Sequence, residues 1–178
     1  MPDVVLKAEH VTKRFGGITA LENAELELYK GEVHALVGAN GAGKSTLIKI
    51  ITGAYPKDEG EIYLDGKQIE VKSTFDAREK GISAVYQEFS LINTVSVAEN
   101  IFMGKLLYNN LGPIPRADWK KMHEETQKIL DSLGVINIKP ETIVGRLSVA
   151  QKQMVEIAKA LSNDLKVLIM DEPTASLS

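Results

Sequence analysis

A glycine-rich run lies between an apolar segment and a helix-forming one, and few folds accommodate that order. The run matches the pattern G-x-x-x-x-G-K-[ST]. It consists of Gly38, Ala39, Asn40, Gly41, Ala42, Gly43, Lys44, Ser45 and Thr46. We expect a strand buried on both faces over the apolar residues 33–37 and a helix over residues 44–52, the context that this pattern requires. The sequence therefore predicts a strand–loop–helix unit that cradles phosphate.

Each part of the run has a chemical reason. The glycines let the backbone curl so that several N–H groups point at one anion, and the helix that follows adds its positive end. Lys44 carries a full charge toward the β- and γ-phosphates, and Ser45 offers a hydroxyl to Mg²⁺. The alternative is a glycine-rich turn with a chance Lys-Ser pair, which about one window in ten thousand would show. The run predicts nucleoside-triphosphate binding without specifying the reaction.

Two acidic residues follow the last apolar run of the chain. Residues 165–170 predict a strand, and Asp171 and Glu172 come directly after it. Because ligands bind at the carboxyl edge of such sheets, Asp171 is placed to hold Mg²⁺ through water. Glu172 is placed as a general base toward a water behind the γ-phosphate, a role typically worth ~10²–10⁴-fold in rate. The alternative is an ordinary polar strand end before the turn at Pro173.

The composition excludes several classes of protein. With 178 residues, 44% of them apolar and 25% charged, the chain has the size and make-up of about one globular domain. A formal net charge of −3 argues against bulk nucleic-acid binding. The absence of cysteine excludes disulfides, thiolate zinc sites and a cysteine nucleophile. No apolar run approaches the ~18 residues of a membrane-spanning helix.

The remaining patterns predict an α/β fold. Period-two alternation favours strands over residues 4–10 and 24–29, and a hairpin around Asp65 and Gly66. Helical spacing favours helices over residues 118–133, with Trp119 on the apolar side, and 148–161. Helix–strand order with a helical insertion predicts a wound core, a small antiparallel sheet and a helical lobe. Of the histidines, we expect His34 in the core, and His10 and His123 at the surface.

Two further stretches carry a family resemblance. They are Val85, Tyr86, Gln87 and Glu88, and Leu147, Ser148, Val149, Ala150 and Gln151. With the phosphate loop and the acidic pair, in this order and spacing, the whole chain resembles the ATP-binding-cassette (ABC) ATPases. Residues 86–91, 95–101 and 148–161 look most like the ATPase subunits of bacterial monosaccharide importers of the ribose, galactose and xylose types.

The resemblance implies a P-loop NTPase wound-sheet core with an antiparallel β subdomain and a helical lobe. It implies that residues 1–87 hold the β subdomain and nucleotide-binding core, 88–162 the helical lobe, and 163–178 the last core strand and acidic motif. The cassettes of this family continue beyond the acidic motif, so we expect the C-terminal part of the cassette to be absent. We accordingly expect a chain that binds ATP or ADP with Mg²⁺ and hydrolyses slowly alone.

The resemblance also implies roles for individual residues. Phe15 matches an aromatic that stacks on adenine, and Gln87 matches a glutamine that reaches Mg²⁺ and the attacking water. A signature segment closes over the γ-phosphate of a partner cassette, and it corresponds here to Ser148, Val149, Ala150 and Gln151. Val149 and Ala150 replace two glycines of the common pattern, so the backbone is expected to approach that phosphate less closely.

The implied partners are a second cassette, membrane permease subunits and, indirectly, a sugar-binding protein, with no nucleic acid. The implied location is the cytoplasmic face of the membrane, reached through the permease. Two alternatives stay open. One is a soluble cassette protein acting on ribosomes or DNA, although the chain shows neither basic inserts nor coiled-coil arms. The other is a noncatalytic nucleotide-binding module.

Overall fold

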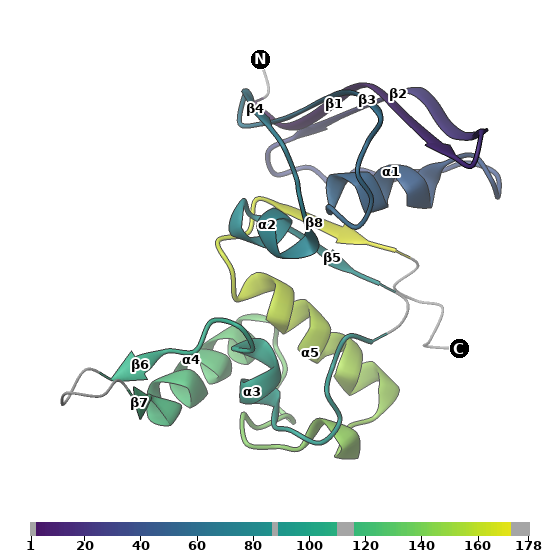
Figure 1. Cartoon of the computed structure of the whole chain (residues 1–178). Coiled ribbons are helices and arrows are strands. Elements are labelled where there is room, and N and C mark those ends of the chain that lie inside the picture. Colours follow the sequence, from purple (N-terminus) through teal and green to yellow (C-terminus); the bar gives the residue numbers. More distant parts are fainter. Residues whose placement is uncertain (1–2, 87–88, 110–115, 172–178) are drawn as a thin grey trace. The chain divides into compact units, whose positions relative to one another are not determined.

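The described part of the chain forms two compact units, each with its own hydrophobic core. The computed structural model describes residues 3–86, 89–109 and 116–171. Within that part, the first unit holds residues 3–83 and 166–169, and the second holds the rest. Figure 1 labels the helices and strands of both.

A four-stranded antiparallel sheet dominates the first unit, with the strand order β2-β1-β3-β4. Its strands are β1 (Val4–Phe15), β2 (Ile18–Tyr29), β3 (Glu59–Leu64) and β4 (Lys67–Ile69). Leu6 and Ala8 alternate inward from β1 and are buried with Ile62 of β3. The predicted hairpin is confirmed, because Asp65 and Gly66 have φ values of 49° and 72° and connect β3 to β4. Positive φ at both turn residues is what a two-residue I′ turn needs.

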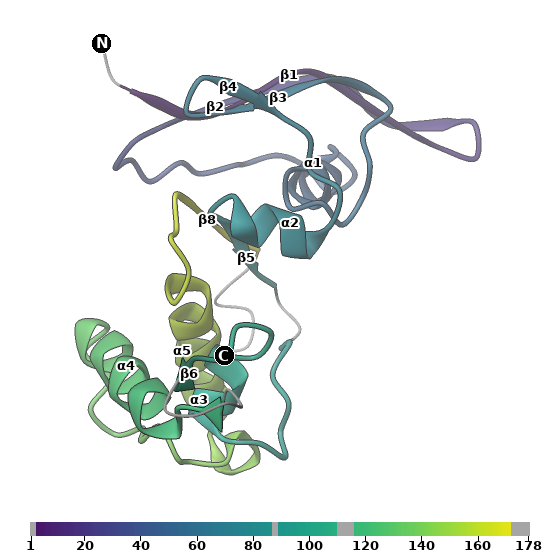
Figure 2. The same cartoon turned by 60° about the vertical axis from the view of Figure 1, so that its left-hand side comes forward.

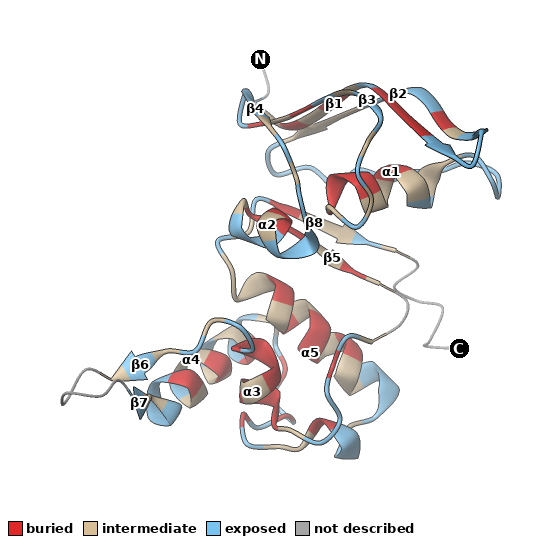
Figure 3. Cartoon of the chain, in the orientation of Figure 1, coloured by how far each residue is buried: buried red, intermediate tan, exposed pale blue. Residues whose placement is uncertain are grey.

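Helix α1 (Lys44–Ile51) lies along this sheet, as Figures 1 and 2 show, and its apolar residues belong to the core of the sheet. Leu47, Ile50 and Ile51 are its buried residues and join the same core as the inward side chains of β1 and β3. Figure 3 marks the buried part of the helix in red. The predicted helix after the glycine-rich run is therefore confirmed. Helix α2 (Thr74–Glu79) follows β4, and its N-cap, Ser73, accepts a hydrogen bond from the Asp76 N–H.

Strands β5 (Ile82–Val85) and β8 (Val167–Met170) form a second, two-stranded sheet. The Val167 N–H donates to the Gly81 carbonyl at 3.1 Å, and the Asp171 N–H donates to the Val85 carbonyl at 3.0 Å. Since both bonds advance in the same direction along the two strands, the pair is parallel. The strand expected over residues 165–170 is confirmed as β8, and Asp171 follows directly after it.

Residues 33–37 do not form the expected buried strand. They adopt neither helix nor strand, and Val37 is 87% exposed. A strand buried on both faces needs hydrogen-bonded neighbours along its edges, and no strand in the described ranges pairs with this segment. The prediction that His34 belongs to the core is wrong for the same reason. Its side chain is exposed, with Nδ1 3.4 Å from Glu32 Oε1.

Three α-helices build the second unit: α3 (Val97–Ile101), α4 (Trp119–Ser132) and α5 (Val149–Leu161). Their core includes Val97, Met122, Leu130 and Val155. The unit also contains a short 3₁₀ turn, η1 (Val144–Arg146), and a minimal hairpin of β6 (Tyr108–Asn109) and β7 (Arg116–Ala117).

The two helices expected from spacing in this region are confirmed to within a residue, and Asp118 and Ser148 are their N-caps. The expectation that Trp119 lies on the apolar side of its helix is wrong, because this first helical residue is 47% exposed. His10 is exposed as expected, whereas His123 is only partly exposed, with its Nδ1 3.3 Å from Glu141 Oε1.

In the portion of the chain that the structure describes, every helix is too short or too polar to cross a membrane.

Candidate nucleotide-binding site

The phosphate loop has the curled backbone that anion binding requires. Gly41 and Gly43 have φ values of 84° and 86°, and the Ala42 N–H donates to the Ala39 carbonyl at 3.2 Å. Gly43 is the N-cap of α1, and its carbonyl accepts the helical bond from the Leu47 N–H at 2.9 Å. Because glycine offers no capping side chain, the first-turn N–H groups stay available to a ligand at the positive end of the helix.

Lys44 places its charge across this loop. Its Nζ donates to the carbonyls of Gly38 at 2.6 Å and of Ala39 at 3.0 Å. These carbonyls begin the loop, so the ammonium group bridges its two ends. Ser45 is exposed beside Lys44 on the first turn of α1. Backbone N–H groups, one ammonium and one hydroxyl form a donor set that fits a polyphosphate with a divalent cation.

The glycine at position 43 is required by packing as well as by φ. A Cβ added there would lie 2.7 Å from Leu21 Cδ1 and 3.2 Å from the Ala20 carbonyl oxygen. The end of the phosphate loop therefore lies directly against the beginning of β2. In the same hairpin, Leu21 pairs with Lys13 and Ile18 pairs with Phe15. This packing ties the phosphate loop to the strand pair that carries Phe15.

Phe15 lies at the end of β1 and is 42% exposed. Its ring meets the Tyr55 ring edge-on, with centroids 5.3 Å apart and an interplanar angle of 72°. The Lys13 Nζ lies over the Phe15 ring, 5.3 Å from its centroid. An exposed, supported ring of this kind can stack on a flat ligand. Sequence reasoning missed Tyr55, because no local pattern indicates that a residue forty positions away will meet Phe15. It missed Lys13 because the placement of this lysine depends on its distant partner Asp58.

The acidic and glutamine motifs are described only in part. Asp171 is half-buried, and its backbone N–H is bound to β5 as described above. Gln87 and Glu172 lie outside the described residues. Asp171 and Ser45 belong to different units. The convergence of these side chains on one metal ion therefore stays a prediction.

The signature residues form the N-terminus of α5. Ser148 and Gln151 make a capping box, in which the Gln151 N–H donates to Ser148 Oγ at 3.3 Å and the Ser148 N–H donates to Gln151 Oε1 at 3.0 Å. Ser148 Oγ keeps its own hydrogen for donation outward. Val149 and Ala150 are exposed. This helix end can therefore seat a second anion supplied from outside the unit.

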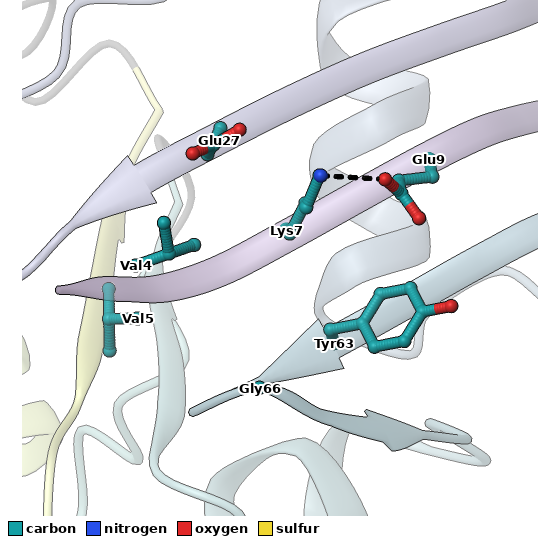
Figure 4. Close-up of a pocket in the computed structure, with 7 residues that line it drawn as sticks. All are labelled: Val4, Val5, Lys7, Glu9, Glu27, Tyr63 and Gly66. Carbon is teal, nitrogen blue, oxygen red and sulfur yellow. Dashed lines mark ion pairs between the residues drawn. The ribbon is translucent and has the colours of Figure 1, made fainter. Parts of the chain in front are cut away.

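A separate hollow of about 270 Å³ lies on the antiparallel sheet. Figure 4 shows its lining: Val4, Val5, Lys7, Glu9, Glu27, Tyr63 and Gly66. Lys7 Nζ lies 2.7 Å from Glu9 Oε1, and this partner raises the pKa of the lysine. None of the nucleotide-site residues predicted from the sequence is among these lining residues. Across the described ranges, His, Asp and Glu side chains form no cluster of three or more suited to a metal ion.

Fold and phosphate loop together define a P-loop ATP-binding cassette. The chain belongs to the ABC transporter family, whose model matches residues 21–175. It is 46% identical over 174 residues to the ribose import ATP-binding protein RbsA of Caldanaerobacter subterraneus, and 43% identical over 180 residues to the xylose import ATP-binding protein XylG of Geobacillus kaustophilus. The matches cover 98% and 100% of this chain but 34% and 35% of those proteins, so the chain spans about a third of their length.

Solved structures agree with this assignment. A nucleotide-free ATP-binding cassette from an ABC transporter superposes with a TM-score of 0.80 at 32% identity, over 97% of this chain and 70% of that one. An ATP-binding cassette of an ABC transporter in its ADP conformation superposes with a TM-score of 0.80 at 31% identity, over 98% of this chain and 71% of that one. The expected family and fold class are confirmed, and the similarity to sugar importers extends over nearly the whole chain.

Proposed function

We propose that this chain binds and hydrolyses ATP with Mg²⁺ as part of an ATPase that energises a sugar importer. The observation that carries the proposal is the phosphate loop, with left-handed Gly41 and Gly43 and with the Lys44 ammonium held across its ends. The import ATP-binding proteins for ribose and xylose that it resembles support the transport role.

Each residue of the proposed nucleotide site has a defined task. The loop N–H groups bind the phosphate oxygens, Lys44 neutralises charge on the β- and γ-phosphates, and Phe15 stacks on adenine. Ser45, Gln87 and Asp171 would hold Mg²⁺, which when bound neutralises charge developing on the phosphate oxygens. Glu172 takes a proton from the water that attacks the γ-phosphate.

The proposal includes a second cassette. The α5 N-terminus, with Ser148 and the exposed Val149 and Ala150, would close over the partner cassette's γ-phosphate, and hydrolysis would reopen the pair. The region 88–162, proposed as the helical lobe, would dock on membrane permease subunits at the cytoplasmic face. A sugar-binding protein would then be an indirect partner.

Calorimetry with Mg-ATP separates binding from chemistry. Lys44→Ala removes charge-assisted hydrogen bonds, each worth about 1.5–3 kcal/mol, so we expect affinity to fall by roughly ten-fold or more. Glu172→Gln keeps the size of the side chain but not the base, so it should bind normally while phosphate release slows. Unchanged ATP affinity in Lys44→Ala would refute the site, and normal turnover in Glu172→Gln would refute the assigned base.

A further inference from the structure

We propose that Tyr55 and Lys13 are positioning residues that orient Phe15 for recognition of the nucleotide base. The inference rests on the proposed nucleotide function and extends it to the loop after α1. The resemblance assigns base stacking to Phe15 alone, whereas the structure surrounds that ring with two residues from different segments.

Tyr55 supports one edge of Phe15. The two rings pack at 72°, the edge-to-face geometry that aromatic pairs favour beyond simple burial. Tyr55 is itself tied to the end of α1, because its N–H donates to the Lys49 carbonyl at 3.0 Å and Lys49 Nζ lies 5.2 Å from its ring centroid. Thus α1 begins at the phosphate loop and ends at the support of Phe15.

Lys13 fixes the orientation of the ring from another side. This lysine is only 7% exposed, and its Nζ lies 2.8 Å from Asp58 Oδ1. Asp58 is held in turn, since its Oδ2 accepts the Arg14 N–H at 2.6 Å and its own N–H donates to the Thr12 carbonyl at 3.0 Å. The ammonium is therefore locked over the Phe15 ring, where cation–π attraction restrains the ring plane.

A restrained ring makes a better stacking surface than a mobile one, because less conformational entropy is lost when the base binds. Removing the Tyr55 ring leaves Phe15 in place but takes away one of the two contacts that restrain its orientation. The part of the affinity that depends on the base should then fall, while the part that depends on the phosphates should not change. A merely structural role for Tyr55 would lower both parts together.

Calorimetry on the 178-residue chain tests this distinction with two probes, Mg-ATP and Mg-tripolyphosphate, the latter having no base. We expect Tyr55→Ala to weaken ATP binding about two- to ten-fold and to leave tripolyphosphate binding unchanged. Tyr55→Phe keeps the ring edge and should behave as wild type. Tyr63→Ala, a tyrosine in the hollow on the sheet, is the matched control and should change neither affinity. Tyr55→Leu replaces the alanine variant if the latter is unstable.

If Tyr55→Ala left the ratio of the ATP and tripolyphosphate affinities unchanged, the positioning role would be overturned. The proposed nucleotide function would stay intact in that case. A wild-type chain that binds neither ligand would overturn the proposed function and this inference with it.

Discussion

Substituting alanine for Gly43 tests whether the phosphate loop is held by β2 as the structure indicates. The added Cβ has no room, since it would meet Leu21 Cδ1 at 2.7 Å and the Ala20 carbonyl oxygen at 3.2 Å. Leu21 is buried in the core of the unit and cannot simply swing outward. Gly41→Ala is a matched control, because Gly41 has nearly the same φ but no atom within 4 Å of an added Cβ.

The magnitudes separate strain from packing. An alanine in the left-handed region costs roughly 1–2 kcal/mol, partly offset by about 0.4–1 kcal/mol from the stiffer unfolded chain. Gly41→Ala should therefore lose about 1 kcal/mol. Gly43→Ala carries the same terms and adds overpacking of about 1–3 kcal/mol, so its total loss should be about 2–4 kcal/mol.

Thermal unfolding followed by circular dichroism measures the difference. For a chain of this length each kcal/mol moves Tm by about 2–4 °C, so the Gly43 variant should melt several degrees below the Gly41 variant. Its Mg-ATP affinity should also fall more, because the shifted loop displaces the first turn of α1. Equal melting temperatures for the two variants would show that β2 does not confine the loop.

Two further predictions concern the supports of the site. Hydrogen bonds from the Lys13 ammonium and the Arg14 N–H lower the pKa of Asp58 below its ordinary 3.8. The ionised Asp58 carboxylate therefore stabilises the folded state fully above pH 3.8, and this contribution is lost as the pH falls through the lowered pKa. Asp58→Asn should therefore lower the free energy of unfolding at neutral pH. In urea titrations at falling pH, that free energy should decrease less steeply for the variant than for the wild type. Parallel pH dependences of the two proteins would contradict this. Ser148→Ala should lower the free energy of unfolding by about 1 kcal/mol, because the N-cap of α5 is lost. Ser148→Asp should keep the cap and therefore the stability. A Tm of the aspartate variant as low as that of the alanine variant would show that Ser148 does not act as a cap.

Elements with strong local signals could be predicted from the sequence. The glycine-rich run and the apolar side of residues 44–52 are enough to define α1, and Asp65 with Gly66 defines the β3–β4 hairpin. Asp118 and Ser148 mark helix starts because their side chains cap the first turn, a contact that spans only three residues. In each case the residues that make the structure are neighbours in the chain.

Predictions failed where the structure depends on distant partners. Residues 33–37 have the composition of a buried strand, but a strand forms only where another strand offers its edge, and the sequence pattern does not report that edge. Lys13 gave no signal of burial, yet it is buried because Asp58, 45 residues away, neutralises its charge. The placement of Gln87 and Glu172 stays a prediction.

The same dependence on distant partners explains how one short helix can connect the two parts of the proposed nucleotide site, the phosphate loop and the ring that stacks on the base. The phosphate loop alone would bind any polyphosphate, because backbone N–H groups and a lysine do not distinguish the attached base. In the proposed site, base recognition depends on Phe15 of β1, whose ring meets Tyr55 just after the end of α1, whereas Leu21 of β2 packs against Gly43 at the start of α1. A shift of α1 along its axis would therefore change both seats at once. A variant that moved α1 would weaken the binding of ATP and of tripolyphosphate together, whereas a variant that only freed the Phe15 ring would weaken the binding of ATP alone. Comparing the two affinities therefore distinguishes these cases.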